Sequence, residues 1–150
     1  MRVFTDLDEL KAAVGETLGS SAWRTVTQEQ VNQFAEATGD HQWIHVDPER
    51  AAAGPFGGPI AHGYLTLSLI PVLSSEIFRV QGIRMGVNYG VNKVRFPSPV
   101  PVGSRVRSTA ELIEAVTTAQ GVRTTVRHTI EIEGGAKPAC VAEVLALIVP

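Results

Sequence analysis

The chain has 150 residues, of which 44% are hydrophobic and 19% charged, and its formal net charge is -2 at pH 7. This length and composition are typical of a single globular domain spanning residues 1–150, and they exclude an intrinsically disordered chain. The weak negative charge, with no cluster of lysines and arginines, argues against a nucleic-acid partner or an anionic membrane surface.

The amino-terminal residues and the cysteine content bear on the compartment. Residues 1–15 contain acidic side chains and no long apolar run, which is not the pattern of a signal peptide. No apolar stretch reaches the roughly 18 residues of a membrane span. Cys140 is the only cysteine, so no intrachain disulfide can form. We therefore expect a cytoplasmic protein without a membrane partner.

The first third of the chain predicts short helices. The apolar positions of residues 6–14 indicate an amphipathic helix, and residues 23–26 indicate a short strand. Thr27, with Gln30 three residues later, forms a capping-box pattern at the start of a second helix. Gly39 stands where that helix would end with a C′ glycine.

The stretch GDHQWIH, residues 39–45, connects this helix to the next one. Asp47 and Pro48 form an N-cap and first-turn pair, and the glycines and prolines of residues 54–59 end the short helix that follows. Because the stretch follows a helix stop and precedes an N-cap, we expect it to be non-helical. A tight connection of this kind can hold reactive groups in fixed positions.

Residues 60–80 are apolar on nearly all sides, which indicates a helix enclosed by the rest of the fold. We expect this central helix to cover about residues 60–78. Pro71 falls inside it and is predicted to kink the helix or to bound its first half.

The rest of the chain predicts long strands. Apolar residues alternate over residues 83–91, and their phase shifts by one position near residues 92–93, which predicts a bulge. A second strand contains Val106, and a third starts at Gly121. The last strand, residues 139–149, is apolar on both faces and is expected to be central or to face an interface. One enclosed helix followed by a run of strands predicts an α+β fold, in which a curved antiparallel sheet wraps the helix.

Three motifs together resemble the MaoC-like, R-specific enoyl-CoA hydratases, also called hydratase 2. They are FAEATGDHQWIHVDPERAA at residues 34–52, AHGYLT at residues 61–66 and KVRFPSPVPVGSRV at residues 93–106. The first motif looks closest to the nodulation-protein-N-like dehydratases. The resemblance extends from Trp23 to the end of the chain, and it implies a hot-dog fold.

The resemblance implies reversible addition of water to a trans-2-enoyl thioester, giving a (3R)-3-hydroxyacyl thioester, as in fatty acid metabolism. The substrate would be carried by CoA or by acyl-carrier protein. The family's pattern assigns Asp40 and His45 to proton transfer around one bound water, and the backbone N–H of Gly63 to the thioester oxygen. This chemistry needs neither a metal nor a redox cofactor. The family also implies a homodimer, because a single hot-dog sheet leaves an open edge and an incomplete acyl tunnel.

Four further residues are candidates for substrate contacts. Gln42 stands where many family members have asparagine, and it supplies the same amide groups from a longer stem. His62 precedes Gly63 and either lines the site or packs at the start of the helix. Tyr64 and Asn88 are candidates for the walls of the acyl tunnel.

Other interpretations of these residues remain open. The connection holds four side chains of metal-ligand type: Asp40, His41, His45 and Asp47. Only a helix would bring the two histidines onto one face, so a metal site is disfavoured and His41 is assigned no role. A hot-dog acyl-CoA thioesterase would place its acid on or beside the central helix, which offers only Glu76. A non-catalytic acyl-thioester-binding subunit would lack the acid–base pair, which this chain keeps.

Overall fold

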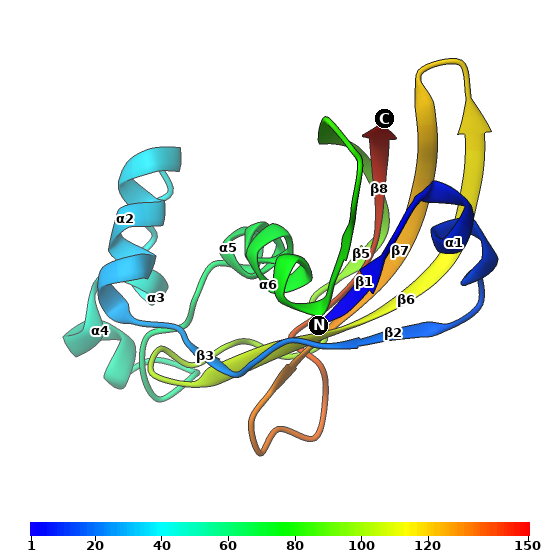
Figure 1. Ribbon diagram of the computed structural model, residues 1–150. Helices are drawn as coiled ribbons and strands as arrows, with labels where there is room; N and C mark the ends of the chain where they lie inside the picture. Colours follow the sequence, from blue (N-terminus) through cyan, green and yellow to red (C-terminus); the bar gives the residue numbers. More distant parts are fainter.

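A computed structural model describes residues 1–150. Its main sheet consists of β2 (Thr17–Ser20), β3 (Arg24–Thr25), β5 (Met85–Arg95), β6 (Arg105–Thr118), β7 (Gly121–Ile132) and β8 (Cys140–Val149). The strand order is β2-β6-β7-β8-β5, and β3 pairs with β6 beside this path. All these pairings are antiparallel. The sheet curves around the central helical segment (Figure 1), which confirms the α+β class and the hot-dog fold.

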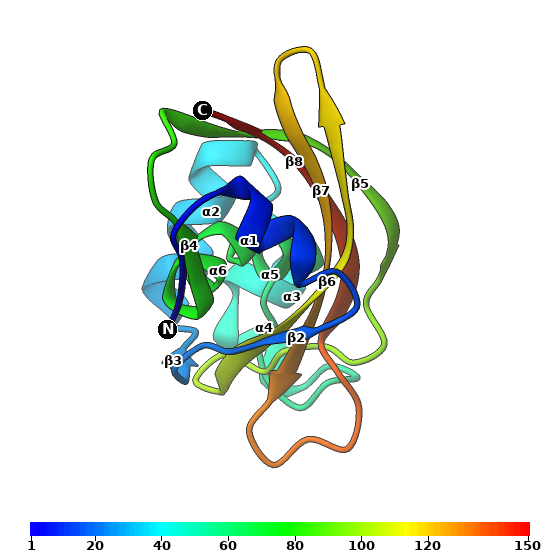
Figure 2. The same cartoon turned by 45° about the vertical axis from the view of Figure 1, so that its right-hand side comes forward.

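The central helix is formed by two consecutive segments, α5 (Gly63–Ser68) and α6 (Ile70–Ile77), which lie in the hollow of the sheet (Figure 2). Pro71 lies in the first turn of α6, where a missing N–H is tolerated, and the first half of the helix ends just before it, as predicted. The helix begins three residues later than expected. Residue Ile60 instead forms an isolated antiparallel bridge with Pro101.

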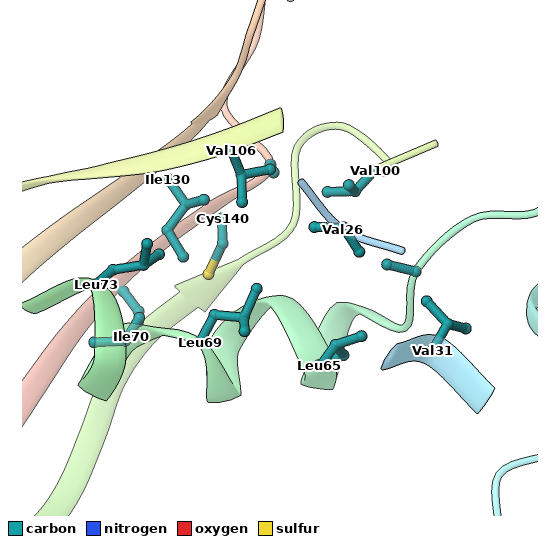
Figure 3. Packing of buried hydrophobic residues seen from close by; sticks show 13 residues of the cluster. Val26, Val31, Leu65, Leu69, Ile70, Leu73, Val100, Val106, Ile130 and Cys140 are labelled. Carbon is teal, nitrogen blue, oxygen red and sulfur yellow. The ribbon is translucent and has the colours of Figure 1, made fainter. Parts of the chain in front are cut away.

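The core lies between this helix and the inner face of the sheet. In Figure 3, Leu69, Ile70 and Leu73 of the helical segments face Ile130 and Cys140 of the sheet. A second cluster lies farther along the sheet, around the amino-terminal residues, and its buried members are Phe4, Leu10, Ala13, Leu18, Ile77, Ala110, Leu112, Val126 and Ile148.

Strand β5 forms an exposed edge of the sheet. The bulge predicted near residues 92–93 is present, since the β5–β8 register shifts between Asn92 and Arg95. Strand β8 lies inside the sheet, between β7 and β5, as its apolar sequence predicted. Strand β5 pairs only with β8 and is exposed over nearly its whole length. Its exposed large apolar side chains are Met85, Val87, Tyr89 and Val91.

Smaller elements complete the amino-terminal half. The predicted helix of residues 6–14 is α1 (Leu7–Ala12), with Asp6 as its N-cap. A two-stranded parallel sheet of β1 (Arg2–Phe4) and β4 (Phe78–Val80) was not expected from the sequence. It ties the start of the chain to the end of α6.

The helices beside the sheet are α2 (Gln28–Thr38), α3 (Trp43–Val46) and α4 (Pro48–Ala52). Thr27 and Asp47 cap α2 and α4 as predicted. The expectation of a non-helical connection was wrong for its second half, because residues 43–46 form the single turn α3. None of the helices combines the length and the hydropathy that crossing a bilayer requires.

Candidate active site

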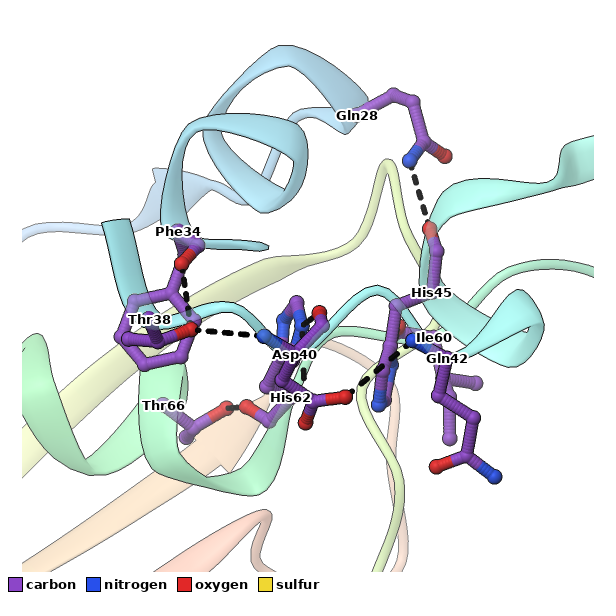
Figure 4. Close-up of polar contacts among 9 residues, drawn as sticks. All are labelled: Gln28, Phe34, Thr38, Asp40, Gln42, His45, Ile60, His62 and Thr66. Carbon is purple, nitrogen blue, oxygen red and sulfur yellow. Dashed lines mark hydrogen bonds and ion pairs between the residues drawn. The ribbon is translucent and has the colours of Figure 1, made fainter. Parts of the chain in front are cut away.

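Asp40 is held at the end of α2 by the turn that Gly39 makes. Gly39 adopts φ of 82°, a left-handed conformation that favours glycine, and its N–H donates to the carbonyl of Ala35. The Asp40 carboxylate accepts a hydrogen bond from the backbone N–H of Gln42 at 3.3 Å. Its side chain is 51% exposed. The hydrogen bond, drawn in Figure 4, holds the carboxylate in position, and its exposure leaves it open to a small molecule.

His45 lies on α3 and is buried. Its Nδ1 is 2.7 Å from the carbonyl oxygen of Ile60, which can only accept, so Nδ1 carries the proton of the neutral ring. Nε2 is then the unprotonated nitrogen. Burial is the main cause that lowers the pKa of His45 below its usual value, and the nearby His62 lowers this pKa further. The hydrogen bond to Ile60 and the Asp40 charge oppose this shift. His45 is thus kept as a neutral base at neutral pH.

His62, the residue before α5, joins Asp40 and His45 into one cluster. Its Nε2 donates to the main-chain carbonyl of Asp40 at 2.9 Å and lies 4.0 Å from the Asp40 carboxylate. Its ring stacks on that of His45, with centroids 3.9 Å apart and planes inclined by 26°. On the other side, Phe34 of α2 packs against His62 at 4.9 Å. His62 is only 2% exposed, and its buried Nδ1 has no hydrogen-bond partner.

Gly63 begins α5 directly after His62. The N–H groups of a helix's first turn have no partners within the helix, and His62 provides no side-chain cap here. A Cβ added at Gly63 would come within 3.2 Å of the Phe96 ring. The absence of a side chain at this position therefore lets α5 start against the loop that contains Phe96.

The remaining residues of the connection have mainly structural contacts. Gln42 is exposed, and its backbone N–H, not its side chain, bonds Asp40. The Trp43 ring packs under the Arg50 guanidinium at 4.3 Å. It also lies so close to Gly54 that a Cβ added there would come within 2.9 Å of the ring. His41 is half-exposed and lies 3.6 Å from Glu36, away from the cluster.

Two candidates for the acyl tunnel lie apart from the cluster. Tyr64 is 71% exposed at the start of α5, with its ring 6.3 Å from that of Phe96. Asn88 of β5 lines a cavity of about 590 Å³ between the helices and the sheet, together with Tyr89. This cavity is lined mainly by apolar side chains, and its wall contains neither Asp40 nor His45. The first residue of the central helix that lines this cavity is Leu67, which lies one turn beyond Gly63.

The cluster offers ligand atoms to a cation or to a water molecule. One ligand atom each of Asp40, His45 and His62 lies within 4.8 Å of the others. This group differs from the metal alternative considered from the sequence, since it leaves out His41 and Asp47. Two imidazole nitrogens already donate to main-chain carbonyls, which leaves Nε2 as the nitrogen of His45 that is free to accept a proton. A carboxylate and a neutral imidazole facing one small space are the two groups that general acid–base catalysis on a water needs.

Sequence reasoning missed part of this arrangement. The contact of His62 with both Asp40 and His45 was not foreseen, because these residues are separated by a helix and a loop. Gln28 was also missed; its side-chain N–H₂ donates to the carbonyl of His45 at 2.7 Å. Only the HG pair at the start of the central helix signalled that His62 lies near the site.

Comparisons with known proteins agree with the fold. A family model described as the MaoC like domain matches residues 9–133. The chain is 60% identical over 144 residues to the 3-hydroxyacyl-thioester dehydratase Z of Mycobacterium tuberculosis, a match covering 95% of each chain. It is 46% identical over 144 residues to nodulation protein N of Rhizobium meliloti, covering 94% of this chain and 89% of that relative.

A solved structure gives the same result at lower identity. The (R)-hydratase from A. caviae involved in PHA biosynthesis superposes with a TM-score of 0.73 and 27% identity, over 91% of this chain and 96% of that one. Together with the sequence matches, this confirms the resemblance drawn from the three motifs.

Proposed function

Since the chain belongs to the MaoC-like dehydratase family, we propose that it adds water to trans-2-enoyl thioesters and removes it from (3R)-3-hydroxyacyl thioesters. The chain is a hydro-lyase, and its 150 residues act as one domain. The single observation that carries the proposal is the pairing of the Asp40 carboxylate with the neutral, buried His45. The thioester is carried by CoA or by acyl-carrier protein.

Asp40 and His45 are the proposed catalytic residues. One water molecule donates hydrogen bonds to the Asp40 carboxylate and to Nε2 of His45. As the water oxygen attacks Cβ of the enoyl group, the pair takes a proton from the water, and it returns a proton to Cα. The elements of water are thereby added, and the enzyme ends in its starting protonation state. Acid–base groups positioned in this way contribute on the order of 10² to 10⁴ in rate.

The negative charge that develops on the thioester oxygen needs a donor. We assign this to the backbone N–H of Gly63, which has no side-chain cap in front of it and follows His62 in the cluster. His62 is almost fully buried and holds the main chain of Asp40, so its proposed role is to position the pair. Gln42 contributes through its backbone N–H to Asp40.

The apolar cavity of about 590 Å³ is the proposed site of the acyl chain. It begins one helical turn beyond Gly63, and Asn88 contributes to its wall. Tyr64 does not line the cavity, but it follows Gly63 directly and is exposed beside Phe96, so its proposed role is to contact the substrate next to the thioester. A long apolar chain gains most of its affinity from burial of this kind.

A hot-dog thioesterase is the second candidate, and Glu76 argues against it. The Glu76 carboxylate accepts hydrogen bonds from the Arg24 side chain and from the backbone N–H of Ala22 at 3.1 Å. The hydrogen bond from Arg24 is the main cause that lowers the pKa of Glu76. An acid engaged in this way at the end of α6 is not available to activate a water at the start of α5.

We further propose a homodimer formed through β5. This strand is 11 residues long, has no partner on its outer side and exposes apolar side chains that include Val87 and Tyr89. An open edge of this length is a template for pairing with a second strand. A two-fold axis there would also cover the cavity wall at Asn88. Light scattering should give twice the chain mass of 16.1 kDa, and Val87→Lys should shift it toward the monomer.

The test of the function is hydration of crotonyl-CoA and longer enoyl-CoAs, with chiral analysis of the product. Asp40→Asn and His45→Gln should each lower kcat/KM by roughly 10²-fold or more. His41→Gln serves as the matched control, because His41 lies in the same connection but outside the cluster. Melting temperatures show whether each variant is folded.

Two outcomes would contradict the proposal. A folded wild-type protein that hydrates no enoyl-CoA of any chain length would exclude the enzyme assignment and favour a non-catalytic binding subunit. Release of free CoA, without a 3-hydroxyacyl product, would identify a thioesterase.

A further inference from the structure

A third buried histidine, His128, lies on the inner face of β7 far from the connection. It is 2% exposed and lines the apolar cavity. Its neighbours on the same face of β7 are Val126 and Ile130, and its cross-strand partners are Ala110 and Ala142. The small alanines on both sides leave room for the imidazole ring. His128 is thus a polar residue between two apolar neighbours on this face of the strand.

The hydrogen bonds of His128 use only one of its two nitrogens. Nδ1 is 3.0 Å from the hydroxyl oxygen of Ser108 on β6. Ser108 is itself held, since its backbone N–H donates to the Ser21 hydroxyl at 3.0 Å. Nε2 has no hydrogen-bond partner in the protein, and with Nδ1 turned toward Ser108 it is the polar edge of the ring that remains for the cavity.

The ring is uncharged at neutral pH, because burial lowers the pKa of His128 to about 4. A serine hydroxyl can donate to Nδ1 or accept from it. Nε2 can therefore present either an N–H donor or a lone pair to the cavity. A group that both donates and accepts, such as a hydroxyl, matches both arrangements.

The position of the cavity relative to the site gives the part of a substrate that His128 would meet. Its helical wall runs from Leu67 to Ser74, which are four and eleven residues beyond Gly63. At a rise of about 1.5 Å per residue this corresponds to roughly 6 to 16 Å along the helix from the proposed thioester position. A group in the cavity is therefore several carbons away from the reacting double bond.

We propose that His128 is a specificity-determining residue that selects acyl thioesters with an uncharged oxygen, above all a hydroxyl, in the distal part of the acyl chain. This rests on the proposed function, since it takes the cavity as the acyl site. The apolar walls hold the chain, and Nε2 holds its oxygen. A plain chain of the same length would leave Nε2 buried without a partner, which is unfavourable. Sites that bind a substrate hydroxyl in this way discriminate against analogues that lack it.

The experiment compares matched substrates on the wild-type protein. These are trans-2-dodecenoyl-CoA and its analogues with one hydroxyl at successive carbons of the distal half. For at least one position, kcat/KM should exceed that of the plain chain by roughly tenfold or more. Equal values for the plain chain and for every hydroxylated chain would overturn the inference.

Two variants assign the preference to His128. In His128→Leu the ratio of the two kcat/KM values should fall to about one. Thr124→Val is the matched control, because Thr124 lines the same cavity from β7 but its hydroxyl already donates to the Ala146 carbonyl at 3.4 Å. It should keep the wild-type ratio. A ratio that persists in His128→Leu, or disappears equally in Thr124→Val, contradicts the role of His128.

Binding calorimetry separates this inference from the proposed function. Saturated dodecanoyl-CoA and its hydroxylated analogue can bind without being converted. The ratio of their Kd values therefore tests whether the cavity prefers a hydroxyl, even if the protein hydrates no substrate. This ratio can be measured on the wild-type protein alone, so the test does not depend on whether His128→Leu folds. If the protein hydrates crotonyl-CoA but shows no preference between plain and hydroxylated long chains, the proposed function is supported and the inference about His128 is wrong. A tighter Kd for the hydroxylated chain supports it.

Discussion

The two regions that bury histidines differ in what holds the rings. In the candidate active site, His45 donates to the main-chain carbonyl of Ile60, His62 donates to that of Asp40, and the two rings stack on each other. In the sheet, His128 is held by the side-chain hydroxyl of Ser108. A carbonyl fixes which nitrogen carries the proton, whereas a hydroxyl can exchange roles with the ring.

This difference suits two kinds of task. Proton transfer needs one defined tautomer in one place, because a base that carries its proton on the wrong nitrogen cannot act. Recognition of a ligand group benefits from a ring that can donate or accept. The following predictions test this comparison, beginning with the largest expected effect.

The acid stability of the protein should depend on His128. The unfolded residue takes up a proton as the pH falls below about 6.5, whereas the folded one does so only near pH 4. Its contribution to stability is therefore present above pH 6.5 and is lost as the pH falls from 6.5 to 4, by roughly 3 kcal/mol in total. Urea unfolding of wild type and His128→Leu over this range should show a shallower pH dependence in the variant. Parallel curves would mean that the ring is not buried as described.

His62 should matter for rate through its hydrogen bond more than through its bulk. His62→Phe keeps an aromatic ring against His45 and Phe34 but removes the donor to the Asp40 carbonyl. We expect kcat to fall by roughly 10²-fold, with KM nearly unchanged, because a small displacement of Asp40 is enough for such a loss. His62→Gln, which keeps an N–H donor, should recover part of kcat. If His62→Gln is as impaired as His62→Phe and both melt early, the role of His62 is only structural.

Replacing Gly63 by alanine should be tolerated only if the Phe96 ring moves or is removed. In Gly63→Ala the new Cβ would meet the Phe96 ring at 3.2 Å, so either the ring or the start of α5 must shift. We expect kcat/KM to fall by about tenfold through misplacement of the Gly63 N–H. Adding Phe96→Ala removes the contact and should restore part of the activity. No recovery in the double variant would show that the contact is not the cause.

The smallest effect concerns the acidic side of the pH–rate profile. Because burial lowers the pKa of His45, the ring stays neutral to a lower pH than a free histidine does. The kcat/KM for crotonyl-CoA should therefore be constant near neutral pH and fall only below about 6.5, as His45 takes up a proton. Thr38→Val changes a neighbour of Asp40 without adding a charge, so kcat/KM of this variant should fall at the same pH as in the wild-type protein. An acidic limb centred above 6.5 would contradict a neutral, buried His45.

Local patterns in the sequence predicted most of the fold. The capping residues Thr27 and Asp47 and the stop at Gly39 are confirmed, because helix ends depend on a few neighbouring residues. The bulge near residues 92–93 was also predicted correctly, because a one-residue shift in the apolar alternation is visible in a short stretch of sequence. The short turn α3 was missed because four residues carry too little periodicity to be distinguished from a loop.

The site was only partly accessible to the same reasoning. Asp40 and His45 share one short connection, so their spacing suggested a pair. His62 and His128 acquire their surroundings from segments far apart in the chain, and no local pattern encodes a stacking partner or a cavity. For His128 the only local sign of burial is its place between Val126 and Ile130 on one face of β7.

The pairing of β1 with β4 bears on how this protein can be trimmed. The resemblance to the family begins at Trp23, yet the residues before it bury Phe4, Leu10 and Leu18 against the sheet. Phe4 also packs edge-on at 6.3 Å against Phe78, whose side chain lines the cavity. A fragment that starts at Trp23 would keep every residue that lines the cavity, but it would lose the packing of Phe4 behind Phe78. A fragment that keeps this support for Phe78 has to include β1, which pairs with β4.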